Sequence, residues 1–168
     1  MSTHSPTHDV SDAVPAEASA AGPQEAMAWL LRQFAIDVSG VTHAVLLSRD
    51  GLRLLDSDVD KDWADELSAA VSGMASIASN ITGPRNETHP ATQIMIERED
   101  CLVFVQNAGR AAAVEGYPGT DGFVDTVLAA IATPDADAGR VGFEMGRLIG
   151  RFERYMLVPV RVSAGDVR

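Results

Sequence analysis

GVTHAVLLSRDGLRLLDSD, residues 40–58, contains two short apolar runs separated by a charged turn. Asp50 and Gly51 supply the turn, because glycine adopts positive φ at no steric cost. Alternation along the first run puts Val41, His43, Val45 and Leu47 on one side of the extended chain and Thr42, Ala44 and Leu46 on the other. The pattern predicts a β-hairpin. Both of its faces are apolar, so we expect other elements to cover both.

The rest of the chain alternates between helical and extended patterns. In order, the expected elements are a helix from Gln24 to before Ser39, the hairpin of residues 40–58, a helix from Asp60 to Ile81, a hairpin at 92–109, a strand at 125–133 and a helix from Asp137 to Tyr155. This order, α-β-β-α-β-β-β-α, predicts an α+β (α/β) fold. We expect a five-stranded antiparallel sheet with helices on both faces.

Composition sets the domain boundaries that we expect. Residues 1–23 are small and polar and contain three prolines, so they bury too little surface to offset the entropy of ordering and are predicted to be a disordered arm. Residues 24–156 contain the periodic patterns and are predicted to form one domain. Within it, residues 110–124 are punctuated by glycine and proline and predict a loop inserted into a hairpin. Residues 157–168 form a C-terminal tail.

The predicted central helix carries two stripes of residues. We expect the larger apolar stripe to pack on the sheet; it consists of Trp63, Leu67, Ala70, Val71, Met74, Ile77, Ala78 and Ile81. The second stripe contains only small residues, namely Ala69, Ser72, Gly73, Ser76 and Asn80. Such a stripe is typical either of a solvent-facing side or of a place where another backbone comes close.

Charge and composition argue against several classes of protein. The net charge of −11 disfavours binding to nucleic-acid phosphates. The chain has no apolar run long enough to cross a membrane and no secretory signal at its start, so we expect no direct membrane insertion. The single cysteine, Cys101, allows no internal disulfide and fits a cytoplasmic location.

No catalytic or cofactor-binding motif is found in the sequence. The four histidines lack metal-ligand spacing, and His43 is expected to be a partly buried strand residue. Neither phosphate-binding glycine motif is present. We therefore expect a protein that is not an enzyme and holds no cofactor or metal.

Glycines recur at every fourth position of the last predicted helix, at Gly142, Gly146 and Gly150. Glycine inside a helix costs about 0.8–1 kcal/mol relative to alanine, so close packing is the natural compensation. We expect this side of the helix to pack against a neighbour within the chain, such as the first helix, rather than against a partner.

The strand at 92–96 is expected to lie at an edge of the sheet. It has no proline and no charge before Glu97, so an exposed apolar edge would invite pairing with another chain. Pairing with the same strand of a second copy would protect it. The predicted homodimer interface consists of Thr92, Gln93, Ile94, Met95 and Ile96.

These features together resemble the Roadblock family, the dynein light chain and MglB type of small domain. The resemblance covers about residues 25–156 and depends on FAIDVSGVTHAVLLSRDGLRLLDSD, on ELSAAVSGMASIASNI, and on ATPDADAGRVGFEMGRLIGRF. It is strongest for the actinobacterial Roadblock proteins encoded in conservons, beside a sensor-kinase-like protein and a Ras-like GTPase. Two departures are the segment 110–124, where the family usually has a short turn, and Ser39 in place of the usual proline.

The resemblance implies a homodimer whose third strands pair across a two-fold axis into one continuous sheet, with the central helices side by side on one face. It also implies a scaffold or regulator that binds a Ras-like small GTPase, including as a GTPase-activating partner. A sensor-kinase-like protein is a further implied partner, and partners would recruit the dimer to the inner face of the membrane. We expect the GTPase to bind Asp62, Asp65, Glu66, Ala69, Ser72, Gly73 and Ser76.

A second function class stays open from the sequence. An antiparallel sheet with helices also describes small-ligand sensor domains of the PAS and profilin type. A pocket with a few convergent polar groups would support that alternative, and the sequence offers no obvious set of such groups.

Overall fold

The structure is a computed structural model, and it describes residues 13–112 and 122–156. Its elements are α1 (Ala16–Ala20), α2 (Pro23–Asp37), β1 (Val41–Ser48), β2 (Arg53–Asp56), α3 (Lys61–Ser79), β3 (Gln93–Glu97), β4 (Leu102–Ala112), β5 (Phe123–Ala132) and α4 (Ala138–Met156). The strands form one antiparallel sheet in the order β2-β1-β5-β4-β3. The predicted fold class is confirmed, and β3 lies at an edge of the sheet.

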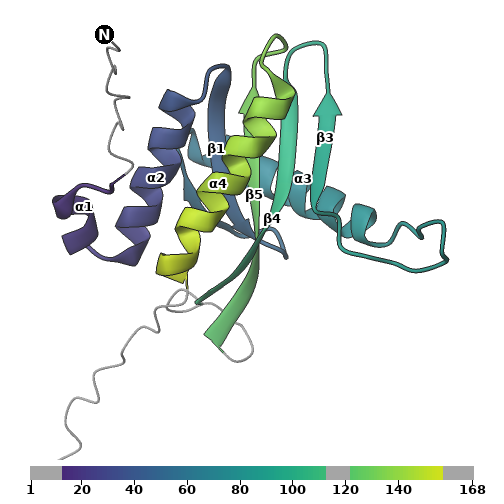
Figure 1. The fold of residues 1–168 in the computed structure, drawn as a ribbon, viewed down its shortest axis with the longest axis horizontal. Helices are drawn as coiled ribbons and strands as arrows, with labels where there is room; N and C mark the ends of the chain where they lie inside the picture. Colours follow the sequence, from purple (N-terminus) through teal and green to yellow (C-terminus); the bar gives the residue numbers. More distant parts are fainter. Residues whose placement is uncertain (1–12, 113–121, 157–168) are drawn as a thin grey trace, which may run out of the picture.

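Helices cover both faces of the sheet, as the apolar hairpin requires. Helices α2 and α4 lie together on one face and α3 crosses the other (Figure 1). The first face is filled by a large buried cluster that includes Leu31, Phe104 and Phe152. The second face holds a smaller cluster around Val45, Val71 and other side chains of β1, β4, β5 and α3. The strands are therefore apolar on both sides because the sheet is the middle layer of three.

The first hairpin follows the predicted alternation, with one exception. Val45 and Leu47 face α3, whereas Ala44 and Leu46 face α2 and α4. Val41 was expected beside Val45, yet it packs in the α2–α4 cluster, because the pairing of β1 with β5 is irregular between Val41 and His43 and reverses the side chain. His43 is half-buried, as predicted.

Two predicted segment boundaries differ from the structure. Residues 13–22 were placed in a disordered arm, but they contain the short helix α1, which has no buried residue. Residues 110–124 were expected to be an inserted loop, but both ends are paired strand, with Arg110 opposite Asp125 and Ala111 opposite Val124. The hairpin therefore continues further than the apolar pattern indicated. The middle of the predicted insertion and the predicted tail, 157–168, lie outside the described residues.

Helix α4 begins as expected, because Asp137 Oδ1 accepts a hydrogen bond from the Arg140 backbone N–H at 2.9 Å. Its first two glycines, however, face the sheet and not α2, because an added Cβ would approach Gln93 at Gly142 and Gln106 at Gly146. Gly142 lies over the sheet, where the Gln106 side-chain amide donates to Gly142 O and to Gln93 Oε1, both at 2.8 Å. An added Cβ at Gly150 would have no atom within 4 Å. Close helix packing therefore explains only the first of the three glycines, and there the neighbour is a strand.

Candidate interaction surface on helix α3 and strand β3

The start of α3 is fixed by a side-chain cap. Asp60 Oδ1 accepts a hydrogen bond from the Trp63 backbone N–H at 2.9 Å, which satisfies one of the free N–H groups of the first turn. The Trp63 ring packs at a tilt on the His43 ring of β1, with 4.8 Å between the ring centroids. These contacts anchor the N-terminal end of α3 to the sheet.

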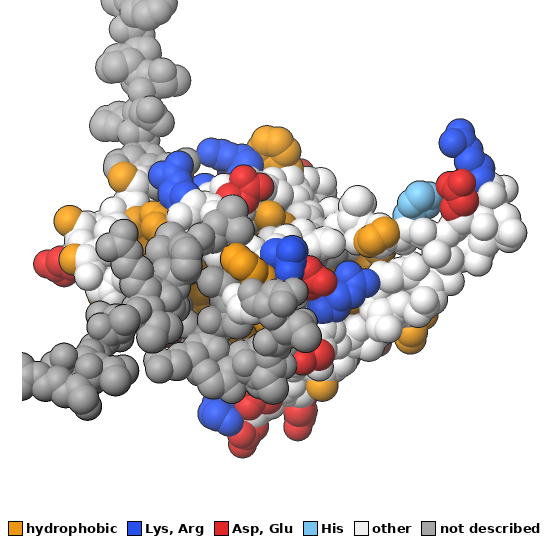
Figure 2. Space-filling model, turned by 90° about the horizontal axis from the view of Figure 1, so that it is seen from below, with side chains coloured by type: hydrophobic (Ala, Val, Ile, Leu, Met, Phe, Trp, Pro, Cys, Tyr) orange, Lys and Arg blue, Asp and Glu red, His pale blue; other side chains and the backbone are white. Residues whose placement is uncertain are grey.

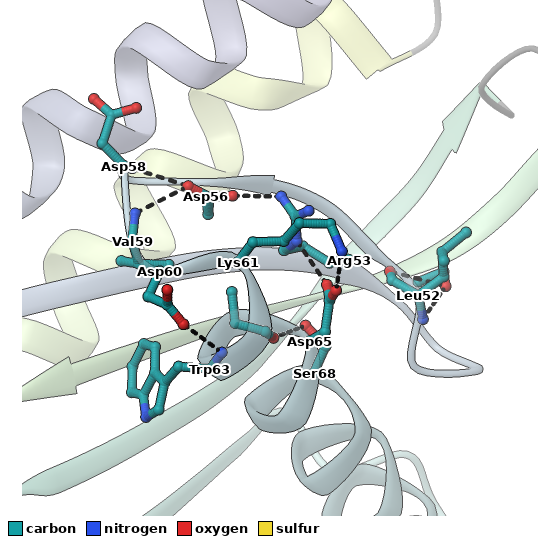
Figure 3. A network of polar contacts seen from close by, with 12 residues as sticks. Leu52, Arg53, Asp56, Asp58, Val59, Asp60, Lys61, Trp63, Asp65 and Ser68 are labelled. Atoms are coloured by element: carbon teal, nitrogen blue, oxygen red, sulfur yellow. Dashed lines mark hydrogen bonds and ion pairs between the residues drawn. The ribbon is translucent and has the colours of Figure 1, made fainter.

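An ion-pair network joins β2 to the first turns of α3 (Figure 3). The Arg53 guanidinium contacts Asp56 Oδ2 at 2.6 Å and Asp65 Oδ1 at 2.8 Å, and Lys61 Nζ lies 3.0 Å from Asp65 Oδ2. The hydrogen bond from Arg53, followed by that from Lys61, holds the pKa of Asp65 below its usual range. Asp65 therefore supports the position of α3 and is not a free charge.

The turn between β1 and β2 rests on the middle of α3. Ser72 Oγ donates to the Arg49 carbonyl at 2.7 Å, and an added Cβ on Gly51 would lie 3.3 Å from Ser72 Cβ. Gly51 also has a φ of +94°. Part of the small-residue stripe is thus explained within the chain, because Ala69 and Ser72 let this turn approach the helix backbone.

The buried side of α3 differs from the one expected. The buried residues of the helix are small or medium-sized, namely Ala64, Ser68, Val71 and Ala75. Much of the predicted apolar stripe does not point at the sheet, because the side chains of Ile77, Ile81 and Trp63 are 69%, 65% and 37% exposed. Leu67 and Met74 are half-buried. The helix therefore sits close to the sheet on small residues and leaves an apolar flank uncovered within one chain.

Strand β3 continues this incomplete face. Its inward residues Ile94 and Ile96 are half-buried and pack against the same cluster as Leu67 and Met74. Met95 points to the other side of the strand and is 49% exposed. Of the predicted dimer residues, Gln93–Ile96 lie in this edge strand, and Thr92 immediately precedes it and is exposed.

The predicted partner-binding residues fall into two groups. Asp65 and Ser72 are half-buried and hydrogen-bonded within the chain, as described above. The other members are exposed and form what we call the outer α3 face: Asp62, Glu66, Ala69, Gly73 and Ser76. An added Cβ on Gly73 meets no atom within 4 Å, so this face is open in the single chain.

Residues 13–112 and 122–156 contain no cluster of side chains that could hold a metal ion. Nor is any helix in those ranges long and apolar enough to span a membrane. A groove of about 700 Å³ lies between α2 and α4, with Arg140, Arg147 and Arg151 among its lining residues. It is an open, charged groove and not the mostly apolar cavity that is typical of small-ligand sites.

Sequence reasoning missed the uncovered apolar flank of α3. Its signal was present, because the apolar residues spread over more of the helix than one contact with a sheet can bury. Ala64, Ser68, Val71 and Ala75 form a narrower stripe at the same helical spacing. Two apolar stripes side by side on one helix indicate two neighbours, and the sheet supplies only one of them.

Comparison with known proteins places these features in a family. The Roadblock/LC7 domain model matches residues 27–114. A Roadblock/LC7 domain structure from Streptomyces avermitilis is 32% identical, covering 78% of this chain and 98% of that one with a TM-score of 0.64. The gliding protein MglB from Thermus thermophilus is 17% identical, covering 80% and 90%, with a TM-score of 0.63. No curated protein matches. The chain belongs to the Roadblock/LC7 domain family.

Proposed function

We propose that this chain is a homodimeric scaffold that binds a Ras-like small GTPase, regulates it without being an enzyme itself, and acts in a signalling complex that partners recruit to the membrane. The observation that carries the proposal is the uncovered apolar surface made by the flank of α3 and the edge strand β3. Family membership and structural likeness to MglB support the GTPase as partner. That step is by analogy, because a shared fold does not by itself determine a function.

A second copy fits the uncovered surface by symmetry. If β3 pairs antiparallel with β3 of the second copy, the two sheets become one, and the α3 helices of both copies lie on the same face. The exposed apolar residues of α3 and the half-buried Ile94 and Ile96 would then gain neighbours. Pairing would also occupy the free backbone groups of the edge strand, which otherwise favour aggregation.

The outer α3 faces of both copies would then form one acidic, sterically open platform. The exposed Asp62 and Glu66 side chains can attract basic residues of a partner, and the absence of a side chain at Gly73 lets its backbone approach closely. We propose the outer α3 face as the GTPase-binding surface. Asp65 and Ser72 support this surface from within, since both are held by internal hydrogen bonds.

The first test is the mass of the protein in solution. Light scattering at micromolar concentration should give about twice the chain mass of 17.8 kDa. A mass of one chain over the whole accessible concentration range would refute the dimer.

The second test is GTPase binding. Ras-like GTPases encoded by the same genome, loaded with GDP or a non-hydrolysable GTP analogue, would be titrated against the wild type and Gly73→Trp. The indole should block close approach and weaken binding at least about tenfold, an effect typical of an interface centre. Glu153→Trp, at an exposed position of α4 on the opposite face, is the matched control. Equal affinities for all three proteins would place the partner elsewhere.

A further inference from the structure

The segment between α3 and β3 is a folded projection. Residues 80–92, which we call the α3–β3 arm, contain a bridge between Thr82 and Thr88. The Gly83 N–H donates to Glu87 O at 2.8 Å, and the Asn86 N–H donates to Gly83 O at 2.9 Å. Asn86 adopts a positive φ of 62°, as asparagine does at tight turns. The arm thus has its own hydrogen-bonded turn.

The arm stands away from the rest of the molecule. It leaves the end of α3 and extends past the free edge of β3 (Figure 1), and its tip carries basic, acidic and histidine side chains in the open (Figure 2). Residues 84–90 are all exposed. Isolated two-stranded hairpins are at best marginally stable in water, so a projecting one gains stability from a surface to pack on.

Antiparallel pairing of β3 with its copy determines what lies next to the arm. In such a pair the start of one strand faces the end of the other. The arm ends directly before Gln93, and the β3–β4 turn, residues 98–101, begins directly after Glu97. The arm of each copy is therefore placed beside the β3–β4 turn of the other copy.

The charges of the two segments are complementary. Arg85 is exposed in the arm and Glu99 is exposed in the turn, and neither makes an ion pair with a residue that the structure describes. Glu97, the last residue of β3, is likewise exposed and makes no ion pair with a described residue, whereas the acidic side chains of Asp100 and Glu87 contact basic groups within the chain. Asp100 Oδ1 lies 2.8 Å from Arg98 Nε, and Glu87 Oε2 lies 3.2 Å from His89 Nε2.

We infer that the α3–β3 arm clasps the β3–β4 turn of the second copy, with Arg85 facing Glu99 of that copy. The clasp rests on the proposed homodimer and occurs twice in it by symmetry. It adds a polar rim at each end of the paired strands.

A charge-exchange experiment tests this contact. In its homodimer, Arg85→Glu places a carboxylate opposite the Glu99 carboxylate, and Glu99→Arg places a guanidinium opposite the Arg85 guanidinium, so both homodimers acquire like charges. In the mixed dimer both contacts join opposite charges. After the two variants are mixed at equal concentration and exchange subunits, random pairing would make half of all dimers mixed. Native mass spectrometry should show a clearly larger fraction of mixed dimers. We expect the ratio of mixed dimers to like dimers to be about tenfold higher than for the control pair. A tenfold ratio corresponds to about 1.4 kcal/mol, which the two exposed ion pairs of the mixed dimer share.

The control pair is Arg110→Glu mixed with Glu153→Arg. Both positions are exposed and outside β3, the arm and the turn, and the two variants have the same net charges as the test pair. This pair should give mixed and like dimers in the proportions expected for random exchange of subunits. If the test pair distributes like the control pair while wild-type dimers persist, the clasp is wrong and the proposed dimer stands. If the wild type forms no dimer, the proposed homodimer is wrong, and the clasp that rests on it is wrong as well.

Discussion

Helices cover the two faces of the sheet to different extents. On one face, α2 and α4 pack side by side and bury large side chains such as Leu30, Met145 and Phe152. On the other face, α3 alone packs on β1, β2 and β5 through small side chains. At the outer edge of this face, Ile94 and Ile96 of β3 are only half-buried, whereas Val103 and Val105 of the neighbouring β4 are buried in the cluster under α3 (Figure 1).

The two faces also differ in how their exposed apolar side chains are arranged. Single exposed apolar residues, such as Ile36 on α2, are ordinary on protein surfaces. On the α3 face, by contrast, exposed Ile77 continues the half-buried Leu67 and Met74 along one side of the helix, and exposed Ile81 follows just beyond its end. A continuous uncovered stripe beside a free strand edge indicates an interface.

The largest effect is expected in the core of the α2–α4 face. Phe152 is fully buried, so Phe152→Ala should lower the free energy of unfolding by about 3–5 kcal/mol, measured by urea denaturation. Phe143→Ala removes the same ring from the same helix where it is exposed, and should change the free energy by less than about 0.5 kcal/mol. Similar losses for both variants would contradict the described burial of this face.

The second prediction concerns the α3 face. Ile77→Asp should leave the fold intact and raise the dimer Kd about 30-fold, about 2 kcal/mol, because a charge replaces an apolar group at the proposed interface. Sedimentation across a dilution series measures this. Ile36→Asp is the matched control, since Ile36 is similarly exposed on a helix of the opposite face. If both variants dimerise like the wild type, α3 does not form the interface.

The layered fold was predictable because its signals are local. Apolar alternation on both sides of β1 requires cover on both faces, and Asp60 and Asp137 mark helix starts by their own capping chemistry. The orientation of α3 was not predictable in the same way. Ile77 and Val71 are equally apolar, and only the tertiary distance between helix and sheet determines which of them is buried.

The candidate site shows the same limit. Ser72 looked like a free small residue, whereas it holds the β1–β2 turn from 23 positions away in the sequence. Asp65 likewise looked like a free acid, and its partner Arg53 lies on another element. Periodicity reports which side of a helix a residue occupies but not which other segment arrives there.

A third prediction tests the contact between this turn and α3. Gly51→Ala combines positive φ with a Cβ 3.3 Å from Ser72 Cβ, so it should lower the free energy of unfolding by about 1–2 kcal/mol or more. Gly109→Ala has a similar φ, +82°, but its Cβ would meet nothing within 4 Å. The difference between the two variants in urea denaturation isolates the helix contact. Equal losses would mean that only backbone strain matters.

A smaller, stabilising effect is expected on α4. Gly150→Ala adds a methyl group in open space inside a helix and should raise the free energy of unfolding by about 0.5–1 kcal/mol. Gly142→Ala should gain less, because its Cβ would lie 2.9 Å from Gln93 Oε1, which must move. Thermal denaturation of both variants checks the order. A larger gain at Gly142 would show that the Gln93–Gln106 hydrogen bonds adjust without cost.

The smallest effect should come from the ion pairs that hold the start of α3. The folded pKa of Asp65 is lowered by Arg53 and then by Lys61, so its carboxylate binds protons less readily in the folded chain than in the unfolded one. The contribution of Asp65 to stability is therefore present above the unfolded pKa and is lost as the pH falls through the lower folded value. Asp65→Asn should be less stable than the wild type near neutral pH, and only slightly so, because water screens the exposed ion pair with Lys61. The difference should shrink in acid, because the Asp65 carboxylate of the wild type then becomes protonated. Urea denaturation of both proteins at neutral and acidic pH measures this, and Asp37→Asn, on α2, serves as the control for acid effects elsewhere. A difference between the wild type and Asp65→Asn that does not change with pH would mean that the Asp65 carboxylate acts through its shape and not through its charge.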